Sequence, residues 1–220
     1  MSFRGKNMSR KILPRRELEL FLDSIETHPA PKLSLEQYTI SAEVAAEILY
    51  IAAFQHDDIV DKNVIDLGTG TGRLALGAAF LGAKTVTGVD IDSESLATAH
   101  KQAMILNLNR NVQWVLGDIE TIVGKFDTVL QNPPFGVRRR GADRRFIEKA
   151  LELGGVTYTL HKSGLSNREF IKRLVQKHAG SITEVYQMDF VIPWMFQFHR
   201  KSKYNIKVDL FRMMANGTKC

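Results

Sequence analysis

The chain of 220 residues is 44% hydrophobic, which is enough for one globular domain with a sizeable core. No stretch is long and apolar enough to span a bilayer, and the basic N-terminus is not followed by the apolar run of a signal peptide. The single cysteine, Cys220, excludes a disulfide framework, and the histidines lack metal-ligand spacing, so we expect no bound metal and a reduced, cytoplasmic setting.

The net charge of +6 is unevenly distributed along the chain. Residues 1–16 contain six bases and no acid, residues 17–100 contain 14 acids and 4 bases, and residues 101–220 contain 20 bases and 10 acids. We therefore expect a basic flexible arm over 1–16 and a single domain over 17–220 with a polyanionic partner on its basic side. The alternative is surface charge that is uneven for no functional reason, since charge alone does not prove nucleic-acid binding.

The N-terminal part of the domain has a helical pattern. Apolar residues from Leu18 to Ile25 recur at helical spacing and predict a short amphipathic helix over 15–27. Ser41 is a suitable N-cap for a second helix that continues to Phe54. These elements form a short N-terminal helical extension ahead of the main sheet.

From Asn63 onward, segments of strand and helix character alternate. The predicted strands are 64–67, 85–91, 112–116, 126–131, 156–160, 182–191 and 204–213, and the predicted helices are 73–81, 93–106, 143–153 and 167–177. This alternation predicts an α/β fold: a Rossmann-like, seven-stranded, mostly parallel sheet with helices on both faces. No helix separates the last two strands, so they should pair antiparallel at one edge.

A glycine-rich turn follows the first of these strands. Gly68, Gly70 and the intervening residues up to Thr71 allow the backbone to pass close to a ligand, and Asp66 directly precedes the turn. Asp90 ends the second strand, where a carboxylate can accept both ribose hydroxyls. The pair predicts an adenosine-containing cofactor.

Two acids favour S-adenosylmethionine over a dinucleotide. Asp66 would repel a pyrophosphate, whereas it could hold the amino group of a methionine moiety directly or through water. Asp118, followed by the apolar Ile119, closes the third strand and could accept from an adenine amino group. For Asp118 the alternative is a helix cap or a turn residue.

The turn Asn132-Pro133-Pro134-Phe135 directly follows the predicted strand 126–131. Two prolines end the strand, and the residue before a proline takes extended geometry. The Asn132 amide oxygen and the Pro133 carbonyl could accept the two hydrogens of a planar substrate's NH2 group while Phe135 stacks on its face. The alternative is a tight turn from which Phe135 returns to the core.

The chain resembles the class I S-adenosylmethionine-dependent methyltransferases that carry an Asn-Pro-Pro-Phe/Tyr motif, over about residues 33 to 213. It is most similar to the small methyltransferase-like ribosomal-RNA adenine-N6 enzymes of archaea and eukaryotes. The residues that carry this match are 35–38, 66–72, 132–135, 160–163 and 196–201.

The resemblance implies a cofactor site and a partner. Gln37 and Tyr38 would close over the methionine end, and the other cofactor residues would be Asp66, Gly68, Gly70, Thr71, Asp90, Ile91, Asp118 and Ile119. The family's hydroxyl after the Gln-Tyr pair could come from Thr39 or from Ser41. Relatives work with a small zinc-containing activator protein that adds its sheet beside theirs, which implies a partner of that kind here.

Basic residues beside the motif predict an RNA surface. The candidates are Arg138, Arg139, Arg140, Arg144, Arg145, His199, Arg200 and Lys201. Contacts with several phosphates would make affinity fall steeply with salt. A solvated loop is the alternative for the arginine cluster, and for His161 and Lys162 a packed or solvated role and a catalytic one stay equally open.

The sequence therefore predicts methyl transfer to the exocyclic N6 amine of an adenosine in RNA, with ribosomal RNA as the expected substrate. The alternatives are a protein N5-glutamine methyltransferase, an rRNA guanine-N2 methyltransferase and a non-catalytic RNA-binding protein on the same fold. The roughly 60 residues before the glycine turn leave little room for the helical recognition domain that glutamine methyltransferases carry.

Overall fold

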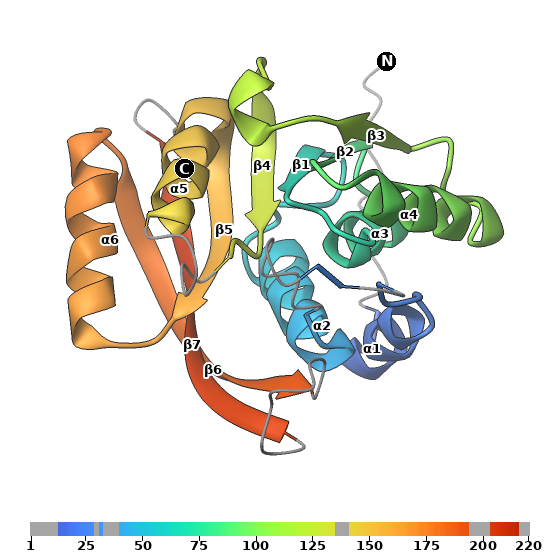
Figure 1. Cartoon of the computed structure of the whole chain (residues 1–220), viewed down its shortest axis with the longest axis horizontal. Helices are drawn as coiled ribbons and strands as arrows, with labels where there is room; N and C mark the ends of the chain where they lie inside the picture. Colours follow the sequence, from blue (N-terminus) through green and yellow to red (C-terminus); the bar gives the residue numbers. More distant parts are fainter. Residues whose placement is uncertain (1–12, 29–30, 33–39, 135–140, 194–202, 216–220) are drawn as a thin grey trace, which may run out of the picture.

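The computed structural model describes residues 13–28, 31–32, 40–134, 141–193 and 203–215. A seven-stranded sheet with strand order β3-β2-β1-β4-β5-β7-β6 runs through the molecule (Figure 1). The strands are β1 (Asn63–Leu67), β2 (Thr85–Asp90), β3 (Val112–Leu116), β4 (Phe126–Gln131), β5 (Gly154–Lys162), β6 (Ser181–Pro193) and β7 (Lys203–Met214). The strands β1 to β5 are parallel to one another, so their carboxyl ends share one edge of the sheet.

Helices cover both faces of this sheet, as predicted. The helices are α1 (Arg15–Asp23), α2 (Ala42–Tyr50), α3 (Arg73–Phe80), α4 (Ser93–Ile105), α5 (Ala142–Leu153) and α6 (Leu165–Lys177), with a short 3₁₀ turn η3 (Ile119–Thr121). Residues of α1, α2 and α3 share one large core cluster, whereas residues of α5 and α6 pack in separate clusters on the opposite face.

The strands reach both cores because successive side chains of a strand point to opposite faces. Val64 of β1 joins the cluster with α1, α2 and α3, and its neighbour Ile65 joins the cluster that includes α5 residues. In β4, Leu130 joins the cluster of Val64 and Val129 joins the cluster of Ile65. Continuous apolar runs in the sequence therefore predicted central strands correctly.

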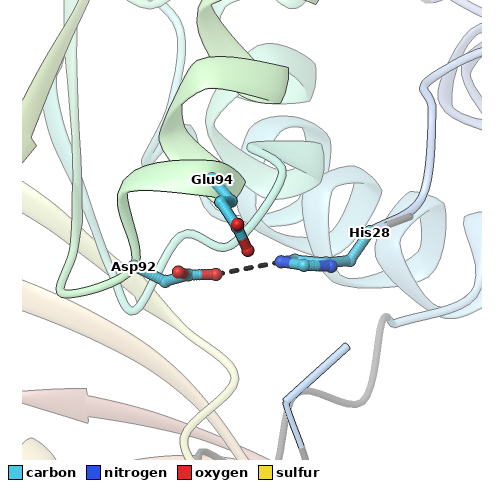
Figure 2. A group of neighbouring side chains, drawn as sticks. All are labelled: His28, Asp92 and Glu94. Carbon is cyan, nitrogen blue, oxygen red and sulfur yellow. Dashed lines mark hydrogen bonds and ion pairs between the residues drawn. The ribbon is translucent and has the colours of Figure 1, made fainter. Parts of the chain in front are cut away.

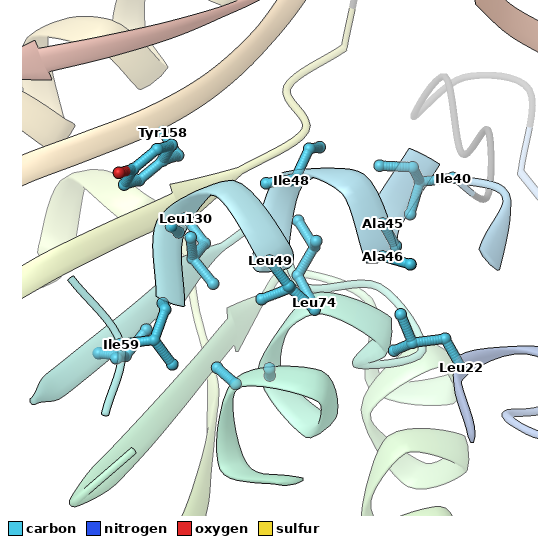
Figure 3. Close-up of a cluster of buried hydrophobic side chains, with 14 of the residues drawn as sticks. Leu22, Ile40, Ala45, Ala46, Ile48, Leu49, Ile59, Leu74, Leu130 and Tyr158 are labelled. Atoms are coloured by element: carbon cyan, nitrogen blue, oxygen red, sulfur yellow. The ribbon is translucent and has the colours of Figure 1, made fainter. Parts of the chain in front are cut away.

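The larger core contains Leu22 of α1, Leu49 of α2, Leu74 of α3 and Leu130 of β4 (Figure 3). All four side chains are buried. Burial of side chains of this size stabilises a fold by about 1.5–3 kcal/mol each. The N-terminal helix α1 is thus part of the domain core.

The last two strands confirm the predicted antiparallel pair. β7 lies between β5 and β6 and is antiparallel to both, so β6 forms the edge. Tyr158 of β5 donates its hydroxyl proton to Asp58 Oδ2 at 2.6 Å, and Arg212 Nε of β7 donates to the same oxygen at 3.0 Å. This buried polar group joins β5 and β7 to the chain segment after α2.

Some boundaries differ from the sequence predictions. Helix α1 ends at Asp23 rather than near residue 27, and α2 ends at Tyr50 and continues as a π-helical turn, η2 (Ile51–Gln55). Helix α1 begins at Arg15, so residues 15 and 16 of the predicted arm are helical; the arm up to residue 12 lies outside the described residues. Among the described helices, none is long and apolar enough to cross a membrane.

Trp114 of β3 fills the space beneath the glycine-rich turn. A Cβ atom on Gly72 would lie 2.6 Å from the Trp114 ring, and one on Gly88 of β2 would lie 2.4 Å from it. Contacts this short are not tolerated in a packed interior. Glycine is therefore required at residue 88 for packing and at residue 72 for both packing and its φ of 83°.

We expect a Gly88→Ala substitution to lower the free energy of unfolding by about 1–3 kcal/mol, because the new methyl group forces Trp114 to move. Gly117→Ala is the matched control, since its Cβ would meet only Thr121 Oγ1 at 3.6 Å. Urea denaturation of both variants measures the difference. Equal stability of the two variants would contradict this account of the packing.

Candidate cofactor and methyl-transfer site

The site lies where the parallel strands end. β1, β2 and β4 finish at Leu67, Asp90 and Gln131, and the chain leaves each of them at the same edge of the sheet. In parallel α/β sheets, ligands bind outside the carboxyl ends of the strands. The predicted cofactor loops and the Asn132 turn are therefore brought to one edge.

The glycine-rich turn has the backbone geometry that its sequence predicts. Gly68, Gly70 and Gly72 have φ angles of 70°, 57° and 83°, in the left-handed region that favours glycine. A Cβ on Gly70 would meet no atom within 4 Å, so open space borders the turn at this residue. The turn therefore leaves room for a ligand beside its backbone, while Thr71 within it is buried.

Asp66 is buried at the start of the turn. Its Oδ2 accepts hydrogen bonds from the Thr69 hydroxyl at 2.6 Å and from the Ala75 amide at 3.1 Å. Burial raises the pKa of Asp66 to about 7, and these two hydrogen bonds offset the rise only in part. A carboxyl group poised in this way is strongly stabilised as a carboxylate by a nearby cation, which fits an ammonium group.

Asp90 ties the two cofactor loops together. Its Oδ2 accepts from the Gly70 amide at 2.8 Å, and its Oδ1 accepts from the Asp92 amide at 2.9 Å. Burial raises the pKa of this carboxyl group above its ordinary value. The next residue, Ile91, is 59% exposed. An exposed apolar side chain beside an oriented carboxylate suits a nucleoside.

Asp118 accepts hydrogen bonds from two neighbouring parts of the chain. It accepts from the Glu120 amide at 3.0 Å, as the cap of η3, and from Arg145 Nη2 at 3.0 and 3.1 Å. Arg145 also donates to Glu120. Asp118 is thus a capping residue, its neighbour Ile119 is buried, and a contact of either with the adenine stays a prediction.

Asn132 carries a buried acceptor that has no donor in the described part of the chain. Its Oδ1 is shielded from solvent and makes no hydrogen bond there. Pro133 is buried beside it. An unsatisfied buried amide oxygen costs free energy and is rare in folded proteins, so each one needs an explanation. A substrate N–H group would satisfy it.

A hydrogen-bond chain runs behind this turn. Gln131 Nε2 donates to Thr159 Oγ1 at 2.9 Å, and Thr159 Oγ1 lies 2.8 Å from His161 Nε2. Burial lowers the pKa of His161 to about 3, so the ring is neutral at physiological pH. His161 is thus a packed side chain that also contacts the Phe211 ring, whereas Lys162 is exposed.

Several predicted site residues lie outside the described residues: Gln37, Tyr38, Phe135, Arg138, Arg139, Arg140, His199, Arg200 and Lys201. Of the two described RNA candidates, Arg144 pairs with Glu148 at 3.0 Å and Arg145 with Asp118 and Glu120. Ser41 Oγ accepts from the Val44 amide at 3.3 Å, which confirms it as the cap of α2.

The sequence did not predict a cluster of three polar side chains beside the loop that follows β2. His28 Nε2 lies 2.9 Å from Asp92 Oδ2, and Glu94 lies close by (Figure 2). The three residues have metal-ligand spacing, but the Lys32 ammonium lies 2.5 Å from Asp92 Oδ1 and 3.1 Å from Glu94 Oε2. A cation of the chain itself therefore neutralises these carboxylates.

The described residues fit S-adenosylmethionine. Open space borders Gly70, the Asp90 carboxylate is oriented beside an exposed apolar side chain, and the buried Asp66 lies at the other end of the turn. Asp66 suits the methionine amino group and Asp90 the ribose hydroxyls. The group would supply an electrophilic methyl on its sulfonium.

Because the pKa of Asp66 is raised in the folded protein, we expect the free energy of unfolding to depend on pH. Between pH 4 and 7 the folded protein retains a proton that the unfolded chain has released, so stability falls as pH rises through this window. An Asp66→Asn variant lacks this effect. Urea denaturation should show the wild type losing about 2–3 kcal/mol relative to the variant between pH 5 and pH 8.

The exposed acid Glu169 provides the control, because Glu169→Gln should keep a nearly constant difference from the wild type over the same range. A difference between wild type and Asp66→Asn that does not change with pH would contradict the burial argument.

Comparisons with known proteins find relatives along nearly the whole chain. A family model of the methyltransferase small domain matches residues 43–187. The chain is 34% identical over 207 residues to the rRNA N(6)-adenosine-methyltransferase Mettl5 of Drosophila melanogaster, covering 91% of this chain and 96% of the relative. It is 40% identical over 218 residues to an uncharacterized protein of Methanocaldococcus jannaschii, covering 94% and 96%.

A solved crystal structure is also similar to this chain in fold and sequence. The crystal structure of a Pyrococcus horikoshii protein, named as a "putative RNA methyltransferase", superposes with a TM-score of 0.86 at 34% identity, covering 93% of this chain and 99% of that one. The family model spans more than half of the chain, and relatives above 30% identity align along nearly its whole length. The chain therefore belongs to the small-domain methyltransferases that include the METTL5 rRNA N(6)-adenosine-methyltransferases, and it is an S-adenosylmethionine-dependent enzyme of Rossmann-like fold.

Proposed function

We propose that this protein methylates the exocyclic N6 amine of an adenosine in RNA, with ribosomal RNA as its substrate and the cytoplasm as its setting. The observation that carries the proposal is the buried Asn132 Oδ1, which has no donor among the described residues. Membership of a family that includes rRNA N(6)-adenosine-methyltransferases supports the choice of amine and of polymer.

Asn132 would act by accepting an N–H of the target amine. The adenine amine is a poor nucleophile because its lone pair is delocalised into the ring. Hydrogen bonds from its two N–H groups to Asn132 Oδ1 and to the Pro133 carbonyl would hold electron density on nitrogen and stabilise the positive charge that develops there. Such fixed dipoles are among the largest contributions to catalysis.

No strong general base is required, because the amine becomes acidic only as it is methylated. His161 is buried and its pKa is lowered to about 3, so at physiological pH it does not serve as an acid. The target base would have to leave its stack to reach Asn132. Phe135, by its place in the motif, would stack on the flipped base and contribute roughly 1–3 kcal/mol.

The RNA surface would lie on the basic side of the turn. Arg138, Arg139 and Arg140 follow the motif in sequence, and His199, Arg200 and Lys201 form the second basic group. Arg144 and Arg145 each have a carboxylate partner, so a phosphate would have to compete with Glu148, Asp118 or Glu120. We therefore assign the first group the larger share of phosphate binding.

The small zinc-containing activator implied by the resemblance would add a strand to an exposed sheet edge. β3 is one edge, and its last residue, Leu116, is 62% exposed. β6 is the other edge, where Val185 is 43% exposed. We place the partner on β3. Leu116→Lys should then abolish the gain in activity that the added partner brings, while Val185→Lys keeps it; the reverse pattern would contradict this placement.

The function is tested by transfer of a labelled methyl group to total RNA and to ribosomal protein, followed by identification of the product. We expect labelled N6-methyladenosine. N2-methylguanosine would identify a guanine enzyme, label in protein only would identify an amide methyltransferase, and absence of transfer in the presence of the activator would point to a non-catalytic RNA-binding protein.

Asn132→Ala should lower kcat by at least about 100-fold, since it removes the amide oxygen that accepts a hydrogen bond from the reacting nitrogen. Affinity for S-adenosylmethionine, measured by calorimetry, should stay within about twofold of the wild type because the cofactor residues lie on β1 and β2.

Asn111→Ala is the matched control. This asparagine is exposed before β3, at the opposite end of the sheet, and its side-chain amide donates a long hydrogen bond of 3.4 Å to the Lys84 carbonyl. Wild-type activity in Asn132→Ala would exclude the proposed role of its amide.

A further inference from the structure

The segment between α1 and α2 is tied to the glycine-rich turn by one buried arginine. Arg73 is the first residue of α3, directly after Gly72, and is 7% exposed. Its Nη1 donates to the Ile40 carbonyl at 2.5 Å and its Nη2 to the Ile25 carbonyl at 3.0 Å. The two carbonyls bracket residues 26–39, which we call the anchor segment; of these, 26–28 and 31–32 are described.

Burial removes water from this guanidinium and lowers the pKa of Arg73, and the charge of Asp23 offsets this in part. A planar fork can hold two carbonyls at once, which a lysine ammonium on a flexible stem cannot do with the same geometry. The arrangement therefore fixes both ends of the anchor segment against the residue that follows the turn.

A second connection leads from the anchor segment to the other cofactor loop. His28 Nε2 donates to Asp92 Oδ2 at 2.9 Å, and both side chains are buried (Figure 2). Ser95 Oγ donates to the same oxygen at 2.9 Å. The Asp92 amide in turn donates to Asp90 Oδ1, and Asp90 Oδ2 accepts from Gly70.

These contacts form one continuous network. It runs from the anchor segment through Asp92 to Asp90 and Gly70; the backbone from Gly70 to Arg73 and the hydrogen bonds of Arg73 lead back to the anchor segment. Strands β1 and β2 fix the backbone only as far as Leu67 and Asp90, and the glycines beyond Leu67 lose much conformational entropy when ordered. Loops that are already ordered bind a ligand more tightly because that cost is not incurred on binding.

We propose that Arg73 and His28 are positioning residues for S-adenosylmethionine, which hold the glycine-rich turn and the Asp90 loop in the geometry that binds the cofactor. The inference rests on the cofactor assignment but not on the identity of the methylated substrate. Neither residue belongs to the turn that holds Asn132, which follows a different strand, β4. Their loss should therefore weaken cofactor binding without slowing the chemical step.

The test uses the full chain and two variants, His28→Phe and Arg73→Lys. Calorimetry with S-adenosylmethionine in the absence of RNA should show Kd about tenfold above the wild type for each, the size expected from one lost buried hydrogen bond to a charged group. With labelled substrate, KM for S-adenosylmethionine should rise by the same factor while kcat at saturating cofactor stays within about twofold.

Glu26→Gln is the matched control. Glu26 also lies in the anchor segment and pairs with Lys101 of α4 at 3.1 Å, but the pair is exposed and has no contact with Asp90. It should leave Kd unchanged. His28→Gln should restore most of the affinity, since its amide can donate in place of the ring nitrogen.

Unchanged Kd in both variants with a lowered melting temperature would show a purely structural role and overturn the proposal, as would a fall in kcat without a change in KM. If His28→Phe does not fold, the comparison of Arg73→Lys with Glu26→Gln decides. Because binding is measured without RNA, failure to find the methylated nucleoside leaves this test intact.

Discussion

The amide oxygen of Asn132 is buried at the end of a central parallel strand, and the described residues offer it no hydrogen-bond donor. Leaving such a group unsatisfied costs about 1–3 kcal/mol. Pro133 and Pro134 supply no backbone N–H groups, so neither of them can remove that cost. The fold holds the acceptor in place regardless, and this makes the turn complementary to a group that brings N–H donors.

The rest of the sheet brings the proposed cofactor loops to the same edge as that acceptor. β1, β2 and β4 are neighbours and parallel, so the glycine-rich turn, Asp90 and Asn132 leave the sheet at one edge. Trp114 supports the turn from below, which requires glycine at residues 72 and 88. The His28–Asp92 contact and Arg73 then join both cofactor loops to the N-terminal segment. Cofactor binding and amine recognition thus rest on different strands, which is why substitutions should separate them.

Much of this arrangement could be predicted from the sequence. The strands, the glycine-rich turn, the antiparallel pair β6 and β7 and the Ser41 cap all depend on local patterns, namely apolar runs, glycine spacing and capping residues. The place of Asp90 at the end of the second strand was also predictable, whereas its role at the ribose stays a prediction.

Contacts between distant parts of the sequence were not predictable. Arg73 meets the carbonyls of Ile25 and Ile40, and His28 meets Asp92, yet backbone carbonyls and lone histidines leave no pattern in a single sequence. The pairing of Arg145 with Asp118 likewise depends on how α5 packs near η3. Gln37, Tyr38, Phe135 and the arginines 138–140 lie outside the described residues, and their roles stay predictions.

The most direct test of the account is a crystal structure of the protein with S-adenosylhomocysteine and adenosine monophosphate. The account predicts the adenine amine within about 3.2 Å of Asn132 Oδ1, a hydrogen-bond distance, with the amine facing the sulfur of the cofactor product. An adenine bound with its amine turned away from Asn132, or an Asn132 Oδ1 satisfied by another residue of the chain, would contradict it.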